Sequence, residues 1–394
     1  MTRRQNNPAP IHNRRRPIRL IQPRHSHQPT PASQAKIPSY SLSNPRMAPL
    51  TDPIHLTKIP LTPRNRLNLS ALYTIPGKLK TMIPSFSSVL PNSLPESLLE
   101  SLPEPIRLVA VDMDGTLLPD FSTVVSPRNQ QALKAAQQAG IVVAIATGRR
   151  QAFTAPLLQD VGLRADTPMI TSNGAVTRNF AGDRIDFEHL HPSIARELCS
   201  VLHGVGLLVF TLDKSGAPDL LVENITAAHG RLARWVDANR HAIQEVTPLA
   251  SALTDSVELI QGMAAGTIAE MEEAQRLLSL SPLADQFDVI RTAYPGHDLT
   301  ILDLLPKGVS KSFALARLAR RLGIPQAQTM AIGDNWNDES MLDWAGVGVL
   351  MGNATEELRD LAPGRGWLVG PTNCQDGVAQ MLELAIATLD SARV

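Results

Sequence analysis

Three carboxylates stand in two short segments whose residue types suit metal-assisted phosphate chemistry. Asp112 and Asp114 lie two residues apart, directly after an apolar run, and Gly115 and Thr116 follow them. Asp334 comes directly after another apolar run, far along the chain. Mg²⁺ prefers oxygen ligands and is commonly held by one or two carboxylates together with substrate phosphate and water. These residues predict a magnesium site; the alternative for Asp112 and Asp114 is a turn that caps the next segment.

Candidate phosphate-binding residues occur at two further places. Thr147 and Gly148 end the second apolar run and offer a hydroxyl and a main-chain amide, although a Thr-Gly pair is also a common turn. Lys311 opens an amphipathic helix, where a cation opposes the helix dipole by a few tenths of a kcal/mol. That cost makes sense if an anion lies beside it; a solvated lysine is the alternative. Lys307 competes for this role, and we favour Lys311 because it is on the helix.

The segment from Gly333 to Asp338 adds three candidates. Asp334 is placed to complete the metal site at a strand end. Asn337 either donates to the phosphate or caps the helix that follows. Asp338 is a candidate to support the residues that touch phosphate or metal, and stabilisation of the helix dipole explains it equally well.

The elements that must position these residues alternate between strand and helix. Ser126 and Pro127 begin a helix as its N-cap and first helical residue. Short apolar runs, each followed by polar residues, predict parallel strands at 106–111, 141–146, 168–171, 329–332, 347–351 and 367–369. This pattern is typical of an α/β fold with a Rossmann-like parallel sheet core. Ligands of such folds bind at the carboxyl ends of the strands.

The region between the two halves of this core has a different sequence pattern. It contains a hairpin-like apolar piece at 206–210 and a helical pattern from Ile225 to Asn239. We therefore expect an inserted α+β domain. The predicted domain limits are 105–184 and 297–394 for the core, 185–296 for the insertion, and 1–104 for an N-terminal tail.

Residues 1–104 differ in composition from the remainder. They hold 14 of the 37 Lys and Arg residues, four of the 37 Asp and Glu residues, and 17 of the 31 prolines. Such a segment cannot bury enough apolar surface to fold, so we predict disorder. It resembles an organelle transit peptide, and an over-long gene model is the alternative. Aromatic residues are not interleaved with its charges, which disfavours nucleic-acid binding.

Two further features bound the class of protein. No apolar run approaches the ~20 residues that a membrane-spanning helix needs, so no membrane partner is expected. Cys199 and Cys374 form neither a CxxC motif nor a disulfide framework, which indicates a reducing compartment. We expect a cytoplasmic protein, or one in an organelle stroma or matrix if the tail is a transit peptide. The oligomeric state is left open.

Taken together, these segments resemble the four motifs of the haloacid dehalogenase-like (HAD) superfamily, in order. They are Asp112-x-Asp114-Gly115-Thr116, Thr147-Gly148-Arg149, Lys311 and Gly333-Asp334-x-x-Asn337-Asp338. The separation of Thr147 from Lys311 leaves room for an inserted cap, as in the Cof-type branch with a type IIB cap. Ser172-Asn173-Gly174-Ala175 and Gly308-Val309-Ser310-Lys311 also resemble that branch.

The resemblance implies a phosphatase and a role for each motif residue. Asp112 would be the nucleophile that forms an aspartyl-phosphate, and Asp114 the general acid and base. Mg²⁺ would bind Asp112, Asp334 and a main-chain carbonyl, which the family places at Asp114, with Met113 as the less favoured choice. The phosphate would bind Thr147, Gly148, Lys311 and Asn337.

Members of this branch typically hydrolyse small phosphorylated metabolites such as sugar phosphates, and some act on flavin mononucleotide or pyridoxal phosphate. Two alternatives remain open at this point. A phosphotransferase or mutase would pass the phosphoryl group to a sugar hydroxyl, which a labelled phosphate would reveal. A non-catalytic phosphate sensor would be expected to lack Asp112 or Asp114, and both are present.

Overall fold

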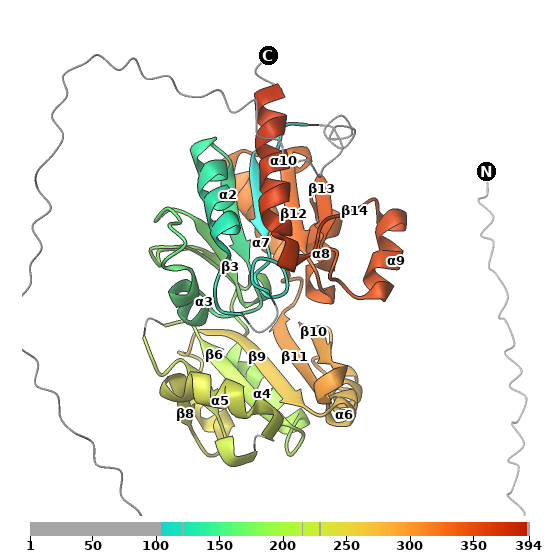
Figure 1. Ribbon diagram of the computed structural model, residues 1–394. Helices are drawn as coiled ribbons and strands as arrows, with labels where there is room; N and C mark the ends of the chain where they lie inside the picture. Colours follow the sequence, from blue (N-terminus) through green and yellow to red (C-terminus); the bar gives the residue numbers. More distant parts are fainter. Residues whose placement is uncertain (1–103, 120–121, 215, 228–229, 392–394) are drawn as a thin grey trace, which may run out of the picture. The chain divides into compact units, whose positions relative to one another are not determined.

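The computed structural model describes residues 104–119, 122–214, 216–227 and 230–391 of the 394-residue chain. The predicted tail therefore lies outside the described residues, except for Glu104. Two sheets organise the described part, one of eight strands and one of six (Figure 1). We call the part built on the eight-stranded sheet the core and the part built on the six-stranded sheet the cap.

The core sheet has the strand order β14-β13-β12-β1-β2-β3-β4-β5. The pairs from β14 to β3 are parallel, whereas β4 and β5 are antiparallel additions at one edge. Its strands are β1 (Leu108–Val111), β2 (Val142–Ala146), β3 (Pro168–Thr171), β4 (Val176–Asn179), β5 (Arg184–Phe187), β12 (Thr329–Gly333), β13 (Val347–Leu350) and β14 (Leu368–Val369). Because β1 lies between β2 and β12, the strand order reverses direction at β1. Such a switch point is where open α/β sheets bind ligands.

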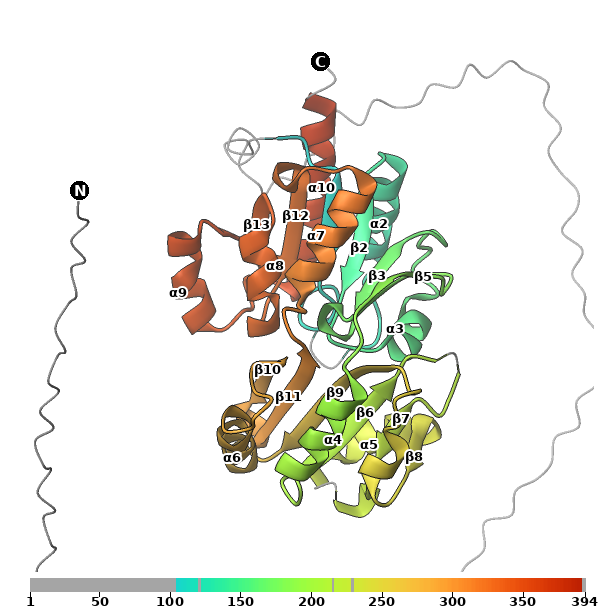
Figure 2. The same ribbon diagram turned by 180° about the vertical axis from the view of Figure 1, so that it is seen from behind.

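Helices cover both faces of this sheet. One face packs on α2 (Pro127–Gln138), α3 (Gln151–Leu158) and α10 (Gly377–Ser391), and the other on α7 (Lys311–Leu322), α8 (Glu339–Trp344) and α9 (Glu356–Arg365). Figures 1 and 2 show these two helical layers from opposite sides. Alternate residues of β1 serve the two layers: Val109 and Val111 face the first, and Leu108 and Ala110 the second. β1 is thus buried on both faces, as a central parallel strand should be.

The helix ends follow from local sequence. The Ser126 side chain caps α2 by accepting from the Asn129 amide at 3.1 Å, and Pro127 follows it. Ser310 caps α7 in the same way, and Gly323 ends it with a left-handed φ of 66°. These boundaries confirm the predicted helix starts, and the parallel sheet confirms the predicted α/β fold class with an inserted α+β cap.

The cap sheet has the order β10-β11-β9-β6-β7-β8 and is antiparallel apart from the β7–β8 pair. Its strands are β6 (Leu207–Leu212), β7 (Leu220–Val222), β8 (Ile243–Glu245), β9 (Leu259–Gly266), β10 (Phe287–Tyr294) and β11 (Leu299–Pro306). α4 (Pro192–Val201) and α6 (Ile268–Ser279) pack on one face of it. α5 (Ala233–Asn239) lies against part of the other face. None of the described helices has the length and apolar character needed to cross a membrane.

Two expectations about the cap differ from the structure. The helix predicted from Ile225 to Asn239 is an α-helix only from Ala233 onward, after short 3₁₀ turns at 225–227 and 230–232. Gly230 interrupts the helical pattern, and glycine costs about 1 kcal/mol in a helix interior. The predicted cap limits, 185 and 296, fall within β5 and within the β10–β11 turn. The cap sheet itself continues to Pro306, because β11 follows β10 as a hairpin.

Candidate active site

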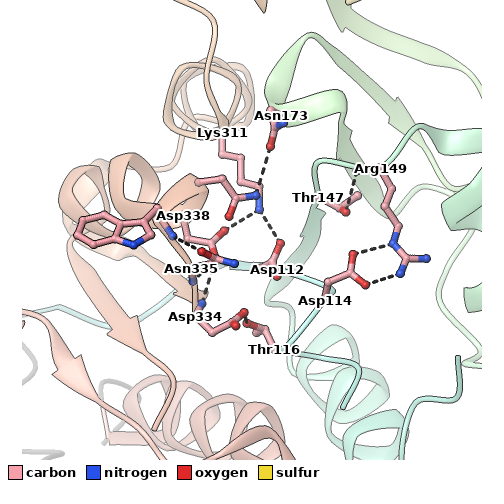
Figure 3. Close-up of polar contacts among 12 residues, drawn as sticks. Asp112, Asp114, Thr116, Thr147, Arg149, Asn173, Lys311, Asp334, Asn335 and Asp338 are labelled. Carbon is pink, nitrogen blue, oxygen red and sulfur yellow. Dashed lines mark hydrogen bonds and ion pairs between the residues drawn. The ribbon is translucent and has the colours of Figure 1, made fainter. Parts of the chain in front are cut away.

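The predicted site residues meet at the carboxyl edge of the core sheet. Asp112 follows β1, Thr147 follows β2 and Asp334 follows β12, and these three strands are neighbours. The Asp112 amide donates to the Ile332 carbonyl at 2.9 Å, which extends the β1–β12 ladder up to the nucleophile candidate. Figure 3 shows the side chains converging at this edge.

Lys311 lies at the centre of the group, at the start of α7. Its Nζ is 2.5 Å from Asp112 Oδ1 and 2.6 Å from Asp338 Oδ1, and its side chain is fully buried. The anions that the sequence led us to expect beside this helix start are thus carboxylates of the protein itself. Lys307 instead forms an exposed ion pair with Asp288 at 2.5 Å.

Burial and charge together set the protonation of this pair. Burial raises the pKa of the Asp112 carboxyl well above its ordinary value; the Asp338 charge adds to this, and the Lys311 charge opposes it. For Lys311, burial alone would lower the pKa, but the two carboxylates outweigh it and raise the pKa. Lys311 is therefore held charged, and Asp112 depends on Lys311 to keep its negative charge.

Asp338 holds the loop that carries Asp334. Its Oδ1 accepts from Lys311, while its Oδ2 accepts from the main-chain amides of Asp334 at 3.0 Å and Asn335 at 3.1 Å. Gly333 makes this approach available, because a Cβ at that position would lie 2.5 Å from the Asp338 Cγ. Both Asp338 oxygens are thus engaged by neighbouring residues, as suits a supporting residue.

The donor set at this edge fits a hard divalent cation. Carboxylate oxygens of Asp112, Asp334 and Asp338 lie within 4.8 Å of one another. Asp334 Oδ1 accepts from the Thr116 hydroxyl at 2.7 Å, which orients that carboxylate. Gly115 has a φ of +79°, and a Cβ there would lie 2.3 Å from Asp334 Oδ2, so a residue with a side chain would force the two loops apart.

The turn after β1 also offers a main-chain oxygen. The carbonyls of Asp112 and Met113 accept from the Leu117 and Leu118 amides at 3.2 and 2.8 Å. The Gly115 carbonyl accepts from Asn353 at 2.8 Å. Among the hydrogen bonds of the described residues none goes to the Asp114 carbonyl, so Asp114 fits the carbonyl ligand better than Met113 does.

The Asp114 side chain points away from Lys311 and pairs with Arg149 (Figure 3). Arg149 Nε donates to Asp114 Oδ2 at 2.6 Å, its Nη2 binds the other carboxylate oxygen, and its guanidinium lies 4.9 Å from the Phe153 ring centroid. The Asp114 side chain is 50% exposed, so it has room to turn. The Thr147 hydroxyl oxygen accepts from the Arg149 amide at 3.1 Å, which leaves its proton for another acceptor.

Two residues to which the sequence gave no role lie beside the predicted phosphate ligands. Asn337 Nδ2 donates to Asn173 Oδ1 at 3.4 Å, and Asn173 Nδ2 donates to Asp303 Oδ2 at 2.9 Å. Gly148 lies against the same amide, since a Cβ there would be 3.0 Å from Asn173 Oδ1. Asp303 is the only acid in the apolar strand β11, and that isolation is a signal that sequence reading could have used.

Asp303 gives a testable pH dependence. Burial raises the pKa of its carboxyl from 3.8 to about 7, although the Asn173 hydrogen bond and the Lys311 charge oppose this. Between pH 3.8 and about pH 7, the folded protein keeps the Asp303 proton that the unfolded chain releases. The contribution of Asp303 to the free energy of unfolding therefore falls as pH rises through this interval. The slope is up to about 1.4 kcal/mol per pH unit. Relative to Asp303→Asn, the wild type should lose stability from pH 5 to pH 7 in urea unfolding. A pH-independent difference would contradict this.

Comparisons with known proteins identify the family of this chain. The model of the haloacid dehalogenase-like hydrolase family matches residues 109–382. Phosphatase YwpJ of Bacillus subtilis (strain 168) is 30% identical over 298 residues, which cover 71% of this chain and 99% of that protein. HMP-PP phosphatase of Cronobacter sakazakii is 33% identical over 262 residues, covering 64% and 86%.

Solved structures of this family also resemble the chain. A haloacid dehalogenase-like hydrolase from Bacteroides thetaiotaomicron superposes with a TM-score of 0.59 at 26% identity, over 71% of this chain and 98% of that one. The family match over residues 109–382 includes the whole cap sheet and all of the core sheet except its first residue, Leu108. The chain therefore belongs to the haloacid dehalogenase-like hydrolases and is a phosphatase of the Cof-type branch with a type IIB cap.

Proposed function

We propose that this phosphatase is a magnesium-dependent phosphomonoesterase that works through an aspartyl-phosphate on Asp112. The observation that carries the proposal is the position of the Asp112 carboxylate at the switch point of the sheet. Lys311 lies 2.5 Å from one of its oxygens, and Asp334 stands at the end of the neighbouring strand. A buried, charge-compensated carboxylate at this edge suits a nucleophile better than a structural ion pair, because a structural pair could lie anywhere in the core.

In the proposed first step, the Asp112 oxygen that is not bound to Lys311 attacks phosphorus, and the bond to the leaving oxygen breaks. Asp114 gives that oxygen a proton, and in the second step it removes a proton from the water that hydrolyses the aspartyl-phosphate. Splitting the displacement in two lowers each barrier. For either step, the Asp114 carboxyl must turn away from Arg149 towards Asp112.

The charge that spreads over the phosphoryl oxygens meets donors that follow β2 and β12 and one at the start of α7. The Thr147 hydroxyl, the Gly148 amide, the Lys311 ammonium and the Asn337 amide would bind these oxygens. Donors that are already in place stabilise the transition state without reorganisation. Mg²⁺, held by Asp112, Asp334 and the Asp114 carbonyl, would neutralise part of the phosphate charge.

The cap supplies the surface next to the leaving group. Residues opposite each other on antiparallel strands point to the same side, and Asp303 lies opposite Met263 and Ile290. The Asp303 side chain reaches the core at Asn173, so this face of the cap sheet is turned towards the site.

The same face carries Thr292 and Tyr294 on β10 and Ile301 on β11. These side chains are uncharged. Thr292 and Ile301 are half-buried and Tyr294 is exposed, although Ile301 is on an interior strand of the sheet. Burial raises the pKa of the Tyr294 hydroxyl, and the Asp114 charge adds to it, which is consistent with Tyr294 standing over the site. A partly apolar surface that also carries the Asp303 carboxylate favours an uncharged leaving group, such as a sugar or a ring, over one with a further phosphate.

Small phosphorylated metabolites with one phosphoester are therefore the proposed substrates, with sugar monophosphates, flavin mononucleotide and pyridoxal phosphate as the first candidates. The similarity to HMP-PP phosphatase supports a small phosphorylated compound. Purified protein should be tested against some tens of such metabolites, each with Mg²⁺ and with EDTA. A sugar bisphosphate should accompany each matching monophosphate.

Activity should require Mg²⁺ and fall when Ca²⁺ is in excess, because the larger and looser coordination of Ca²⁺ misplaces the attacking carboxylate. Each monophosphate should be hydrolysed faster than its bisphosphate partner. Full activity after exhaustive chelation would contradict the metal site, and a preference for bisphosphates would contradict the inferred cap surface.

A further inference from the structure

Three polar side chains from distant parts of the chain form a row that runs from the cap to the phosphate-binding loop. Asp303 on β11 of the cap accepts from Asn173 at 2.9 Å, and Asn173 accepts from Asn337 at 3.4 Å. The residues at the two ends of the row lie on opposite sides of the cap–core junction. The row therefore connects the cap to a predicted phosphate ligand.

The donors and acceptors of the row fix which way the side-chain amides of Asn173 and Asn337 point. The Asn173 NH₂ group faces Asp303, and the Asn173 carbonyl oxygen faces Asn337. Above its raised pKa of about 7 the ionised Asp303 carboxylate can only accept hydrogen bonds, which fixes this orientation. Asn337 then presents its own NH₂ group. One N–H binds Asn173, and the other remains for a phosphate oxygen. The orientation of both amides thus originates at Asp303.

The middle of the row is held rigidly. Asn173 is completely buried and adopts a left-handed conformation, with φ 51° and ψ 28°, which asparagine tolerates better than most residues. The main-chain N–H of Asn173 donates to the Thr147 carbonyl at 3.1 Å. The next residue, Gly174, lies so close to α7 that a Cβ there would be 2.1 Å from the Ser310 carbonyl oxygen. Asn173 therefore cannot move without disturbing the ends of β2 and α7.

Asp303 is costly in terms of stability. It is 9% exposed, and the only hydrogen bond to its carboxylate among the described residues comes from the Asn173 amide. A buried carboxylate that has no cation in contact destabilises a fold relative to an apolar side chain of similar volume. Its place in an otherwise apolar strand is hard to account for by packing.

We propose that Asp303 is a positioning residue that sets the orientation of the Asn337 amide through Asn173, so that tight phosphate binding requires the cap to be seated on the core. This inference rests on the proposed role of Asn337 in phosphate binding. Cap closure would then do more than cover the site: it would complete the phosphate-binding loop through this row. The longer Asn337 contact would shorten once phosphate engages the second N–H.

The test is a double-mutant cycle with inorganic phosphate as the probe. Asp303→Leu keeps the branched shape at Cγ and replaces the acceptor oxygens with methyl groups, so its thermal stability should equal or exceed that of the wild type. Its dissociation constant for phosphate, measured by calorimetry with Mg²⁺, should rise about tenfold, the effect of losing one hydrogen bond to a charged group. Asn337→Ala should show a rise of at least that size. The double variant should bind no more weakly than Asn337→Ala alone.

Arg150→Gln is the matched control. Arg150 also joins the core to the cap, through Asp219 at 2.5 Å and Asn239 at 2.8 Å, but it lies outside the row. Its effect should multiply with that of Asn337→Ala. If Asp303→Leu does not fold, Asp303→Ala takes its place in the same cycle. Asp303→Asn should recover most of the affinity, because its amide oxygen can still accept from Asn173.

Unchanged phosphate affinity in Asp303→Leu, or effects that multiply with Asn337→Ala, would overturn the proposal. Failure of the proposed function has a different signature: the wild type would not hydrolyse p-nitrophenyl phosphate or any metabolite with Mg²⁺. Because the cycle measures phosphate binding, its outcome stands independently of turnover.

Discussion

Asp112→Asn is expected to lower kcat by roughly four orders of magnitude or more, because it keeps the shape of the side chain and removes the attacking anion. The amide also removes one of the two negative charges that surround Lys311. Steady-state hydrolysis of p-nitrophenyl phosphate with Mg²⁺ measures the loss. Retention of a tenth of the wild-type turnover would exclude the covalent mechanism.

Two controls make the result specific to chemistry. Asp166→Asn alters a carboxylate that is 68% exposed and, within the described part of the chain, paired only with Arg164, so its turnover should match the wild type. Acid quenching of the wild type during turnover of phosphorus-32-labelled p-nitrophenyl phosphate should trap label on the protein as the aspartyl-phosphate, and Asp112→Asn should trap none. Turnover that leaves no label on the quenched wild type and inverts the configuration at phosphorus would favour direct attack by water.

Lys311→Met is expected to be the most damaging substitution for stability within the site, with a large loss of kcat as well. The ammonium is fully buried between Asp112 and Asp338. Its removal leaves two carboxylates buried without a counter-charge, which costs about 3–5 kcal/mol. Asp112 would then take up a proton at still higher pH, since the Lys311 charge is what opposes the rise of its pKa. A protonated Asp112 cannot attack phosphorus.

The pH dependence of this variant has a definite sign. A carboxyl whose pKa is raised on folding holds a proton that the unfolded chain releases, so its contribution to stability falls as pH rises through that interval. The stability deficit of Lys311→Met should therefore be smallest in acid and grow towards neutral pH. Urea unfolding across pH, measured with the acid limb of kcat/KM, tests this.

Lys307→Met is the matched control for that experiment. Lys307 lies four residues earlier, and its side chain is 58% exposed in an ion pair with Asp288. Exposed pairs contribute little, so stability should change by less than about 1 kcal/mol and kcat by less than about twofold. If Lys307→Met were the more damaging of the two, our assignment of the motif lysine to Lys311 would be wrong.

The contrast between these two lysines shows where sequence reasoning sufficed. Both are cations near one helix start, and only the position of Lys311 on the helix favoured it. The strands that end at Asp112, Thr147 and Asp334 were predictable because each is a short apolar run with polar residues after it. Parallel strands bring their carboxyl ends to one edge, so the convergence of these residues followed from the pattern.

Prediction was weaker where no periodic pattern exists. The cap helix predicted from Ile225 begins only at Ala233, since local propensity competes there with turns that Gly230 permits. The C-terminal limit predicted for the cap, residue 296, falls inside the β10–β11 hairpin. The cap sheet ends only at Pro306, shortly before the chain re-enters the core.

The sequence by itself determined the fold class, the strand-end motifs and the family to which they belong, because these depend on local residue order. Only the tertiary structure decided that Arg149 pairs with Asp114, that Asp338 holds the Asp334 loop, and that Asp303 reaches Asn173. Such contacts join residues that are far apart in sequence. They form only where glycines let loops approach closely and where buried polar groups must find partners, and no local pattern encodes that requirement.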